Sequence, residues 1–368
     1  MSEPRIVIAG GGTGGHIFPA IAIAQAIQRK APGADLLFIG AKDRMEMEKI
    51  PQAGYKIKGL DIAGFNRSNW LKNLFLPLKI LKSLSEAKQI LKEFSPSAAV
   101  GVGGYASFPM LKAAQQMNIP TIIQEQNSYA GKSNKILGRK ARLVCVAYKN
   151  MDKFFPKAKL LLTGNPVRKS IAKSALTPQE GLQHFGLFTG RKTLLIVGGS
   201  LGAQSINEAV SEHLDELLSW DIQIIWQTGK PYYETAKKHA ADNTHVKVYD
   251  FIKEMDYAYA AADVIISRAG ALAIAELCIV AKPVIFVPYP FAAEDHQTKN
   301  AMALVEHNAA EIVPNNEAKT LLKTKLKDLL NDEVAQEVMR KNLKALAIVD
   351  ADDRIAEKVL ELSKTAHR

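Results

Sequence analysis

The chain has only two cysteines in 368 residues, and no apolar run approaches the roughly 20 residues that a membrane-spanning helix needs. Cys145 and Cys278 stand alone in apolar contexts, without a C-x-x-C spacing. We therefore expect two reduced core thiols, and neither a disulfide framework nor a cysteine-based metal site. The first nine residues are too short and too polar for a signal peptide, which predicts a cytosolic protein.

The motifs of several large protein classes are also missing. The eight histidines show no H-x-H or H-E-x-x-H spacing, so no bound metal or cofactor is expected, although a divalent ion could arrive with a substrate. Asp350-Ala-Asp352 matches a D-x-D metal motif, but it precedes a predicted helix and reads as N-capping carboxylates. The P-loop pattern G-x-x-x-x-G-K-[ST] is absent, and so are the RNP, KH and zinc-finger patterns of nucleic-acid binders.

Positive charge is concentrated in the first half of the chain. The whole chain carries a net charge of +11, and residues 1–166 hold 24 Lys and Arg against 10 Asp and Glu, a net of +14. Residues 167–368 hold 24 against 27, a net of −3. The asymmetry indicates that one lobe faces a polyanion, either nucleic acid or an anionic membrane. A generally lysine-rich proteome is the alternative, but it does not explain the asymmetry.

Short apolar runs alternate with helical patterns, which predicts an α/β protein with parallel sheets. The runs predicted as strands lie near residues 5–10, 34–40, 55–60, 98–102, 120–124, 142–147, 159–163, 193–197, 222–227, 245–248, 263–267, 283–287 and 310–313. Each half opens with a glycine-rich turn, so two Rossmann-like doubly wound domains are expected, at 1–165 and 166–349, with a helix at 350–368 packing back on the first. Ligands of such sheets bind at the carboxyl ends of the strands, which predicts a cleft between the domains.

Residues 5–16 organise the first half. They read Arg-Ile-Val-Ile-Ala-Gly-Gly-Gly-Thr-Gly-Gly-His, which predicts a buried strand and a glycine turn, with a helix beginning after Pro19. Glycines and a helix N-terminus together favour an anion, and His16 would lie beside it; a tight turn capped by His16 is the alternative. The spacing also fits the dinucleotide fingerprint G-x-G-x-x-G. However, the second predicted strand ends in Gly40-Ala41 and lacks the acidic residue that this fingerprint needs.

Polar groups follow other predicted strands. Residues 101–107 form another glycine turn, and Glu125-Gln-Asn127 comes directly after the next strand. In the second half, residues 267–276 run from a strand end into a helix whose small residues leave its N-terminus open to a phosphate. Glu276 could accept both hydroxyls of a ribose, and a solvated helix residue is the alternative. The polar groups of 295–300 suit sugar hydroxyls.

Residues 64–79 crowd aromatic and aliphatic side chains among basic ones. This membrane patch comprises Phe65, Trp70, Leu71, Lys72, Leu74, Phe75, Leu78 and Lys79. One interpretation is a core segment; the other is a surface whose apolar groups enter lipid while the lysines meet anionic headgroups.

Seven motifs together resemble the MurG family of GT-B glycosyltransferases, and their order and spacing match along essentially the whole chain. They are Gly11-Gly-Thr-Gly-Gly-His16, Gly103-Gly-Tyr105, Glu125-Gln-Asn127, Gly164-Asn-Pro-Val-Arg168, Gly198-Gly-Ser200, Arg268-Ala-Gly-Ala-Leu272 with Glu276, and Gln297 to Asn300. The resemblance implies an inverting transfer of N-acetylglucosamine from UDP-N-acetylglucosamine to lipid I, giving lipid II for peptidoglycan and hence cell-wall growth and division. It also implies a peripheral protein on the cytoplasmic face of the bacterial inner membrane, in contact with other cell-wall synthesis proteins.

The resemblance carries site residues with it. The family's donor contacts fall on Thr13, Gly14, Gly15, Asn127, Arg168, Ser200, Ile252, Ala271, Leu272, Ala273, Ile274, Ala275, Glu276 and Gln297. A base must remove the proton of the attacking hydroxyl; His16 is the first candidate because histidine titrates in the useful range, and Glu125 is the second. The family often has His and Gln where this chain has Gln124 and Leu201, so any role of those side chains is open here.

Two other functions stay open. A UDP-N-acetylglucosamine epimerase shares the donor and the fold, but it would need no lipid patch and no acceptor. A nucleic-acid-binding protein would use the basic half of the chain, although no recognition motif accompanies that charge.

Overall fold

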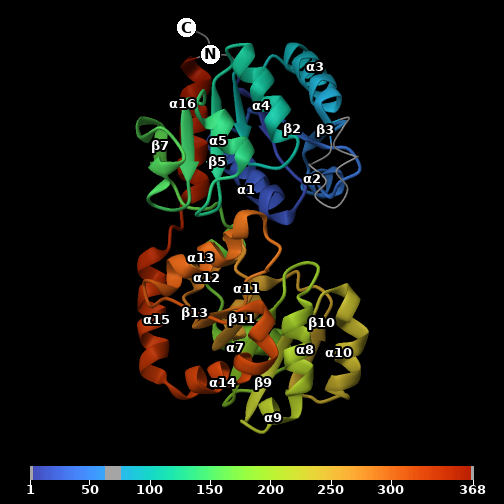
Figure 1. Ribbon diagram of the computed structural model, residues 1–368, viewed down its shortest axis with the longest axis vertical. Helices are drawn as coiled ribbons and strands as arrows, with labels where there is room; N and C mark the ends of the chain where they lie inside the picture. Colours follow the sequence, from blue (N-terminus) through green and yellow to red (C-terminus); the bar gives the residue numbers. More distant parts are fainter. Residues whose placement is uncertain (1–2, 63–75, 366–368) are drawn as a thin grey trace. The chain divides into compact units, whose positions relative to one another are not determined.

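The computed structural model describes residues 3–62 and 76–365. The chain divides into two compact units, one of residues 1–168 with 349–368 and one of residues 169–348. Each unit is built on one parallel sheet with helices on both faces (Figure 1). The chain passes from the first unit to the second after Arg168, three residues beyond the boundary expected at 165.

The first unit carries a seven-stranded sheet in the order β3-β2-β1-β4-β5-β6-β7. The strands are β1 (Arg5–Ala9), β2 (Asp35–Ala41), β3 (Lys56–Leu60), β4 (Ala98–Gly101), β5 (Thr121–Glu125), β6 (Leu143–Val146) and β7 (Leu160–Leu162). The main helices are α1 (Gly14–Lys30), α2 (Glu46–Gln52), α3 (Leu76–Phe94), α4 (Ser107–Gln116), α5 (Lys132–Gly138) and α16 (Ala351–Thr365). Strand order reverses at β1, and the turn after β1 therefore opens where doubly wound sheets bind their ligands.

Alternate residues of the central strand β1 enter two different cores. Ile6 and Ile8 pack in a cluster with residues of α1 and α16, whereas Val7 and Ala9 pack in a cluster with residues of α3 and α4. All four side chains are fully buried, because a parallel sheet covered on both faces needs apolar groups on both. This two-sided burial explains why residues 6–9 are all apolar.

The second unit carries a six-stranded parallel sheet in the order β10-β9-β8-β11-β12-β13. The strands are β8 (Lys192–Val197), β9 (Ile222–Gln227), β10 (Val246–Tyr249), β11 (Val264–Ser267), β12 (Val284–Phe286) and β13 (Glu311–Ile312). The helices are α6 (Lys169–Ala172), α7 (Pro178–His184), α8 (Gln204–Glu212), α9 (Leu214–Leu218), α10 (Tyr233–Ala240), α11 (Met255–Ala261), α12 (Ala271–Val280), α13 (His296–Val305), α14 (Ala318–Asn331) and α15 (Glu333–Leu346).

The predicted strands and cores are confirmed. Each strand in the described part of the chain begins and ends within one residue of a predicted run. Cys145 and Cys278 are free and buried, and burial raises the pKa of each thiol to about 12. The α/β class with two Rossmann-like sheets is therefore correct.

The start of α1 differs from the prediction. The helix begins at Gly14 and contains Pro19, whereas the sequence analysis placed its beginning after that proline. A proline removes its own N–H and crowds the carbonyl four residues before it, here that of Gly15. This loss falls near the beginning of the helix and removes one backbone hydrogen bond, and the buried stripe of Ile17, Ile23 and Ile27 continues through it.

The last helix, α16, packs on α1 of the first unit. Ile355 and Val359 are fully buried in the cluster that contains α1. Arg29 of α1 donates to Asp352 Oδ2 at 2.7 Å and to Asp353 Oδ1 at 2.8 Å. The expectation that Asp352 caps the helix is wrong, because its carboxylate is 7% exposed and pairs with Arg29.

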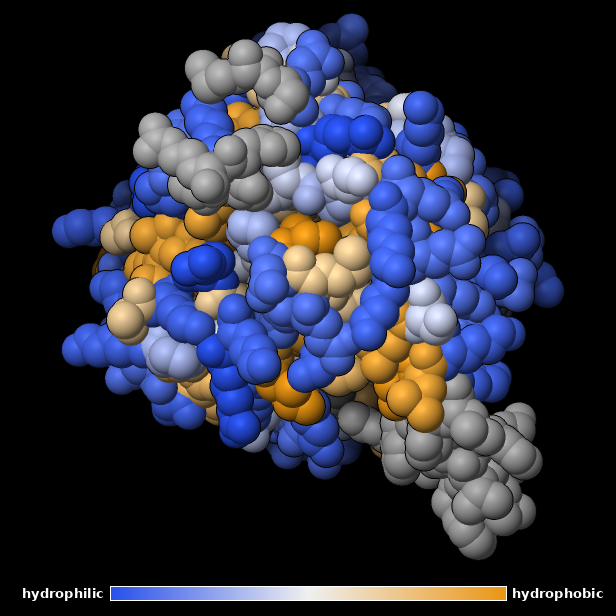
Figure 2. Space-filling model, turned by 90° about the horizontal axis from the view of Figure 1, so that it is seen from above, coloured by the Kyte–Doolittle hydropathy of each residue, from blue (hydrophilic) through white to orange (hydrophobic). Residues whose placement is uncertain are grey.

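No helix among the described residues is both long and apolar enough to cross a bilayer. Phe65, Trp70, Leu71, Lys72, Leu74 and Phe75 of the membrane patch lie outside the described residues, as does the side chain of Leu78, and Lys79 is exposed at the beginning of α3. The face in Figure 2 is covered mainly by hydrophilic side chains, with smaller hydrophobic areas between them.

Arg29→Ala should destabilise the first unit by about 1–3 kcal/mol, because it leaves the buried Asp352 carboxylate without its cation. Urea unfolding of the variant and the parent protein measures the difference. Glu361→Ala is the matched control on α16: Glu361 pairs with Lys358 at the surface, and its loss should leave stability nearly unchanged. Equal losses in the two variants would contradict the importance of the Arg29 pair.

Candidate functional site

Two glycine turns touch at the carboxyl edge of the first sheet. The β1 turn (residues 10–15) and the β4 turn (residues 101–105) follow neighbouring strands. A Cβ on Gly104 would overlap the carbonyl oxygen of Gly11, and Gly12, Gly103 and Gly104 all have positive φ. Only glycine satisfies both the close approach and the backbone conformation. These glycines therefore bring the two turns together.

Glu46, at the beginning of α2, supports the β1 turn from beneath. Its side chain accepts hydrogen bonds from the backbone N–H of Gly12 at 2.8 Å and from that of Ala41 at 3.0 Å. The residue is only 1% exposed. Its carboxylate is thus committed to backbone groups, and it does not supply the exposed acid that a dinucleotide ribose would need.

His16 lies in the first turn of α1, half-buried. Its Nδ1 is 3.0 Å from the carbonyl oxygen of Gly11 and 3.2 Å from Thr13 Oγ1. A carbonyl oxygen can only accept, so Nδ1 carries the proton in this contact. The neutral ring then has its unprotonated nitrogen at Nε2, which is the atom that a general base uses.

Glu125, the second base candidate, is 2% exposed at the end of β5. Its carboxylate accepts from the N–H groups of Asn127 and Gly131 at 3.1 and 3.0 Å and from Asn134 Nδ2 at 2.9 Å. Burial raises the pKa of Glu125, while these hydrogen bonds act in the opposite direction. Both carboxylate oxygens hold the loop that follows β5, and this geometry favours a positioning role over proton transfer.

Buried amides join motifs that are far apart in the sequence. Gln124 Nε2 donates to Asn165 Oδ1 at 2.9 Å, and Asn165 Nδ2 donates to the Gln126 carbonyl at 3.0 Å. Gln126 Nε2 donates to Gln124 Oε1 and to the Val102 carbonyl. The ends of β4, β5 and β7 are thereby fixed to one another, and Gln124 has a structural role here. Such fully hydrogen-bonded networks make a site rigid.

Arg168, the last residue of the first unit before α6, lies beside the ring of Phe18. Its guanidinium carbon lies 5.9 Å from the centre of the Phe18 ring, within the range of a cation–π contact. Thr13, Gly14, Gly15 and Asn127 lie at the same edge, on the turns after β1 and β5.

In the second unit, the β8 turn (residues 198–202) carries Ser200, which is exposed. Gln227, at the end of β9, donates to the Gly199 carbonyl at 3.1 Å and accepts from the Ile252 N–H at 2.9 Å. The buried Ile252 therefore has its N–H already bonded, which leaves its carbonyl as the backbone group for a ligand. A Cβ on Gly202 would overlap the Thr228 carbonyl, so this turn also requires glycine.

The β8 turn also spells G-x-S-x-G, the pattern of a hydrolase nucleophile elbow, so the expectation that this pattern is absent from the sequence is wrong. In such an elbow the serine sits on a strained backbone turn. Here positive φ falls on Gly199 and Gly202, and Ser200 is not among the described non-glycine residues with positive φ. The backbone of the β8 turn therefore lacks the strained serine of a nucleophile elbow.

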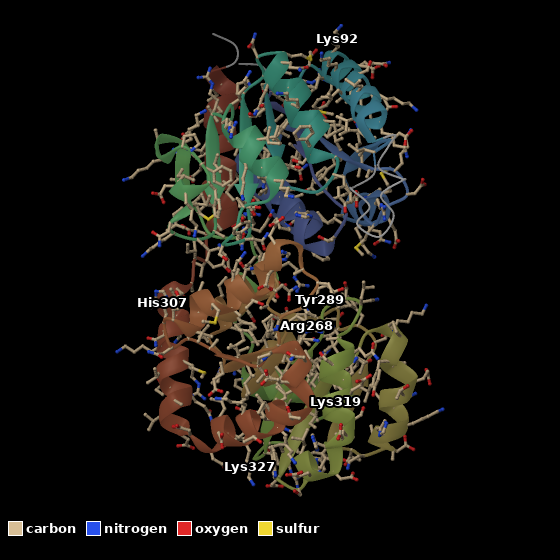
Figure 3. The ribbon with its side chains drawn as sticks, in the orientation of Figure 1. Lys92, Arg268, Tyr289, His307, Lys319 and Lys327 are labelled. Atoms are coloured by element: carbon tan, nitrogen blue, oxygen red, sulfur yellow. The ribbon has the colours of Figure 1, made fainter. Side chains whose placement is uncertain are left out.

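Arg268 lies between β11 and α12. Its guanidinium donates to the carbonyls of Val287 and Pro288 at 2.8 and 3.0 Å and to Asn315 Oδ1 at 2.7 Å. Tyr289 lies beside it, with its ring centre 5.7 Å from the guanidinium carbon (Figure 3). Burial lowers the pKa of Arg268 to about 10, so the side chain stays positive at neutral pH. This cation fixes the loop after β12 at the edge where an anionic ligand is expected.

Helix α12 begins at Ala271, with Gly270 as its N-cap and no side-chain cap. Ala271, Leu272, Ala273 and Ala275 are partly exposed, whereas Ile274 is 3% exposed. The first backbone N–H groups of a helix carry partial positive charge and have no partner within the helix. Small side chains at this end allow a phosphate to approach them.

Glu276 is 8% exposed and accepts from the Tyr259 hydroxyl of α11 at 2.9 Å. Gln297 of α13 accepts from the Tyr289 N–H at 2.9 Å. The alternative that Glu276 is a solvated helix residue is thus excluded by its burial. Glu276 and Gln297 lie on helices that follow the carboxyl ends of strands in the second sheet. Ser200 and Ile252 lie in loops at the same edge.

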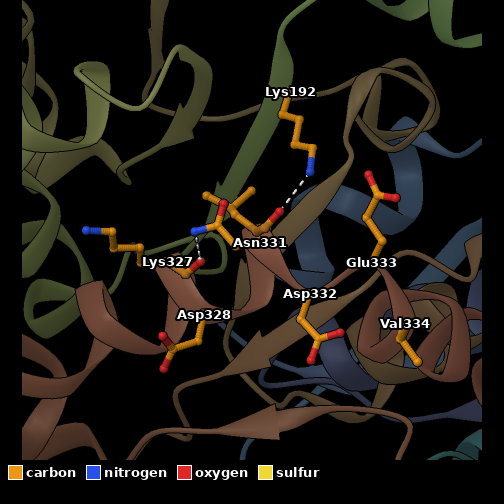
Figure 4. A pocket seen from close by; sticks show the side chains of 8 residues that line it. Lys192, Lys327, Asp328, Asn331, Asp332, Glu333 and Val334 are labelled. Carbon is orange, nitrogen blue, oxygen red and sulfur yellow. Dashed lines mark hydrogen bonds between the residues drawn. The ribbon is translucent and has the colours of Figure 1, made fainter.

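A separate surface hollow lies at the opposite edge of the second sheet. Figure 4 shows it around Lys192, the first residue of β8, and the junction of α14 and α15. Lys192 Nζ donates to the Leu330 carbonyl at 2.7 Å, and Asn331 Nδ2 donates to the Lys327 carbonyl at 2.9 Å. None of the predicted site residues lines it. Within residues 3–62 and 76–365, no group of three or more His, Cys, Asp or Glu could hold a metal ion.

Sequence reasoning missed Glu46, Gln227 and Tyr259. Each acts through a hydrogen bond to a residue distant in the chain, such as the 34 residues between Gly12 and Glu46. A glutamate at the beginning of a helix is ordinary, and nothing in its neighbourhood marks it. The apolar residues before Gln227 predict only a strand.

Comparisons with known proteins match one family domain to each of the two units. Residues 6–146 match the glycosyltransferase family 28 N-terminal domain, and residues 193–355 match the glycosyltransferase family 28 C-terminal domain. A protein of Parabacteroides distasonis is 49% identical over 365 residues, covering 98% of this chain and 99% of its own. That relative is named UDP-N-acetylglucosamine–N-acetylmuramyl-(pentapeptide) pyrophosphoryl-undecaprenol N-acetylglucosamine transferase.

Solved structures show the same architecture. The crystal structure of Acinetobacter baumannii MurG matches with a TM-score of 0.78 and 30% identity, covering 97% of this chain and 99% of that one. A UDP-N-acetylglucosamine 2-epimerase matches with a TM-score of 0.68 and 16% identity over 100% of this chain and 98% of that one, a likeness of fold alone. With two family-28 domains on two Rossmann-like sheets, the chain is a GT-B enzyme that belongs to glycosyltransferase family 28, among its MurG members.

Proposed function

We propose that the protein transfers N-acetylglucosamine from UDP-N-acetylglucosamine to the muramyl sugar of lipid I, an undecaprenyl-diphospho-N-acetylmuramoyl-pentapeptide, and so makes lipid II for peptidoglycan. The observation that carries the proposal is the 49% identity, over 98% of this chain, to a relative named for this reaction. The edges of both sheets support it, because they hold the side chains that a nucleotide sugar and a hydroxyl nucleophile need.

The second unit binds the donor in this proposal. The diphosphate meets the N–H groups at the beginning of α12, Glu276 accepts from the ribose hydroxyls, and Gln297 reaches the sugar. The buried Tyr259 hydroxyl orients Glu276 from its other side. Ser200 and the Ile252 carbonyl complete the set from the turns after β8 and β10. Of the remaining donor contacts proposed by resemblance, Thr13, Gly14, Gly15, Asn127 and Arg168 belong to the first unit.

The first unit supplies the base. The muramyl hydroxyl attacks the anomeric carbon, the bond from that carbon to the diphosphate oxygen breaks, and UDP leaves with inversion of configuration. The hydroxyl proton passes to Nε2 of His16, whose Nδ1 is held by the Gly11 carbonyl. Helix N–H groups can stabilise the leaving charge, so no step in this account depends on a metal ion.

Membrane association belongs to the same proposal. The acceptor carries a polyprenyl chain, so the enzyme must work at a lipid surface, here the cytoplasmic face of the inner membrane. The net charge of +14 on residues 1–166 and the membrane patch support attachment through the first unit.

Incubating the protein with labelled UDP-N-acetylglucosamine and lipid I in detergent tests the function, with lipid II as the expected product. A second sample without lipid I tests the epimerase alternative, which would consume the nucleotide sugar without an acceptor. A third sample with duplex DNA tests the remaining alternative by salt-dependent binding. Absence of lipid II together with turnover of the donor alone would overturn the proposal.

Glu276→Ala should raise the donor KM roughly 30- to 150-fold, because about 2–3 kcal/mol of charge-assisted hydrogen bonding to the ribose is lost. The KM for lipid I should stay near that of the parent. Glu333→Ala, at the exposed beginning of α15, is the matched control and should leave both values unchanged. A donor KM within twofold of the parent would remove Glu276 from the ribose site.

His16→Ala should lower kcat by about 10²–10⁴ while UDP affinity changes little, since a base acts in the transition state. A base must be unprotonated, so parent activity falls as the pH is lowered and His16 takes up a proton; the variant should lose this acidic limb. Steady-state rates against pH and UDP titration measure both. If UDP affinity collapses with the rate, His16 serves binding, and the base lies elsewhere.

Replacing Trp70, Leu74 and Phe75 with serine should leave a folded protein that no longer sediments with anionic vesicles, because that apolar surface is proposed to enter lipid. Leu321→Ser, on α14 of the second unit, is the control and should sediment like the parent protein. Circular dichroism of the triple variant decides the alternative: loss of folding would mean that the membrane patch is a core segment.

A further inference from the structure

The peptide bond between Gly11 and Gly12 is held at both ends by ionisable side chains. Its N–H donates to Glu46 Oε2 at 2.8 Å, and its carbonyl oxygen lies 3.0 Å from His16 Nδ1. A peptide group is planar, with its N–H and C=O antiparallel, so both contacts act on one rigid unit. Glu46, one peptide group and His16 therefore form a continuous hydrogen-bonded chain.

We propose that Glu46 is the positioning residue for His16, acting through this peptide group. The proposal rests on the proposed function of His16 as the base. The Glu46 carboxylate polarises the Gly12 N–H and so makes the Gly11 carbonyl a stronger acceptor, since hydrogen bonds in a chain strengthen one another. That carbonyl then holds the proton on Nδ1 and leaves Nε2 as the unprotonated nitrogen of the neutral ring.

The local packing explains why a carboxylate stands at position 46. Both of its oxygens face backbone N–H groups, those of Gly12 and Ala41, so the site needs two acceptors and no donor. A glutamine would present its amide NH2 to one of those N–H groups and lose a hydrogen bond. A Cβ on Gly11 would overlap Glu46 Oε1, so glycine is required for the carboxylate to fit beneath the turn.

The β4 turn supports the other side of the imidazole. A Cβ on Gly103 would lie 2.8 Å from both Cδ2 and Nε2 of His16, so this edge of the ring rests against the glycine backbone. The ring is thus held at Nδ1 by hydrogen bonding and along its opposite edge by packing. Position and tautomer are set together, and Glu46 sets them without approaching the substrate.

The tautomer of His16 tests the proposal in the unmodified enzyme. The ¹⁵N spectrum of histidine-labelled protein, with His16 assigned by the resonances missing in His16→Gln, should show the neutral ring protonated at Nδ1. Isolated histidine prefers the Nε2–H form, so this result requires the Gly11 carbonyl. A His16 ring protonated at Nε2 would overturn the proposal, and no substrate or activity is needed to see it.

Glu46→Gln tests the link itself. We expect the Nε2–H form of His16 to gain population and kcat to fall about 10- to 100-fold, the range found for hydrogen-bond partners that orient metal-ligating histidines, with the donor KM within threefold of the parent. Glu48→Gln, two residues further along α2 and exposed, is the matched control and should change neither. An unchanged His16 spectrum in folded Glu46→Gln would overturn the proposal.

A double-mutant cycle separates positioning from general support of the fold. In the His16→Ala background, measured with radiolabelled donor, Glu46→Gln should cost less than threefold in kcat because its target is gone. A full 10- to 100-fold loss in that background would show that Glu46 acts on the turn as a whole. If Glu46→Gln does not fold, the spectrum of the unmodified enzyme decides. If lipid II is not formed at all but the tautomer is as expected, the function fails and the hydrogen-bonded chain remains.

Discussion

The approach of two backbones at the edge of the first sheet is the constraint on which the rest of that unit depends. A Cβ on Gly104 would overlap the Gly11 carbonyl oxygen, and a Cβ on Gly11 would overlap the Glu46 carboxylate, so neither position has room for a side chain. The β1 and β4 turns consequently share one surface, and each turn fixes the other. Glycine-rich loops are costly to order, and here burial of Glu46 with two backbone hydrogen bonds offsets part of that cost. His16, the proposed base, is then held on a rigid support.

The second unit stabilises its corresponding turn with different chemistry. Gln227 both donates to Gly199 and accepts from Ile252, where the first unit uses the acceptor-only carboxylate of Glu46. A neutral amide places no charge beneath the β8 turn, and Arg268 adds a positive one at the same edge of the sheet. A buried carboxylate there would repel a diphosphate. This difference suits the proposed function, in which the second unit binds a diphosphate and the first unit carries the imidazole.

Local pattern was enough to predict the sheets. Apolar runs located every strand in the described residues within one residue, and the glycine-rich motifs located the turns at the carboxyl ends of β1, β4 and β8. Local sequence pattern did not predict contacts between residues that are far apart in the chain. The local pattern predicts that Asp352 caps a helix, but in the structure its carboxylate pairs with Arg29 of α1. Glu46 supports the β1 turn through a hydrogen bond from the Gly12 N–H, and no local pattern indicates that bond. Pro19 predicts the beginning of α1 because a proline costs a helix one backbone hydrogen bond. The burial of Ile17, Ile23 and Ile27 outweighs this loss, and the helix begins at Gly14 instead.

The return of α16 to the first unit has a consequence for how the protein is made. Residues 169–348 form one uninterrupted stretch, whereas the first unit is closed only by residues 349–368. During synthesis the second unit can therefore finish folding while the first still lacks the helix that covers Ile6 and Ile8. The apolar face of β1 stays partly uncovered until residues 349–368 have left the ribosome. A chain truncated before Val349 would carry an intact second unit and a first unit with an open core.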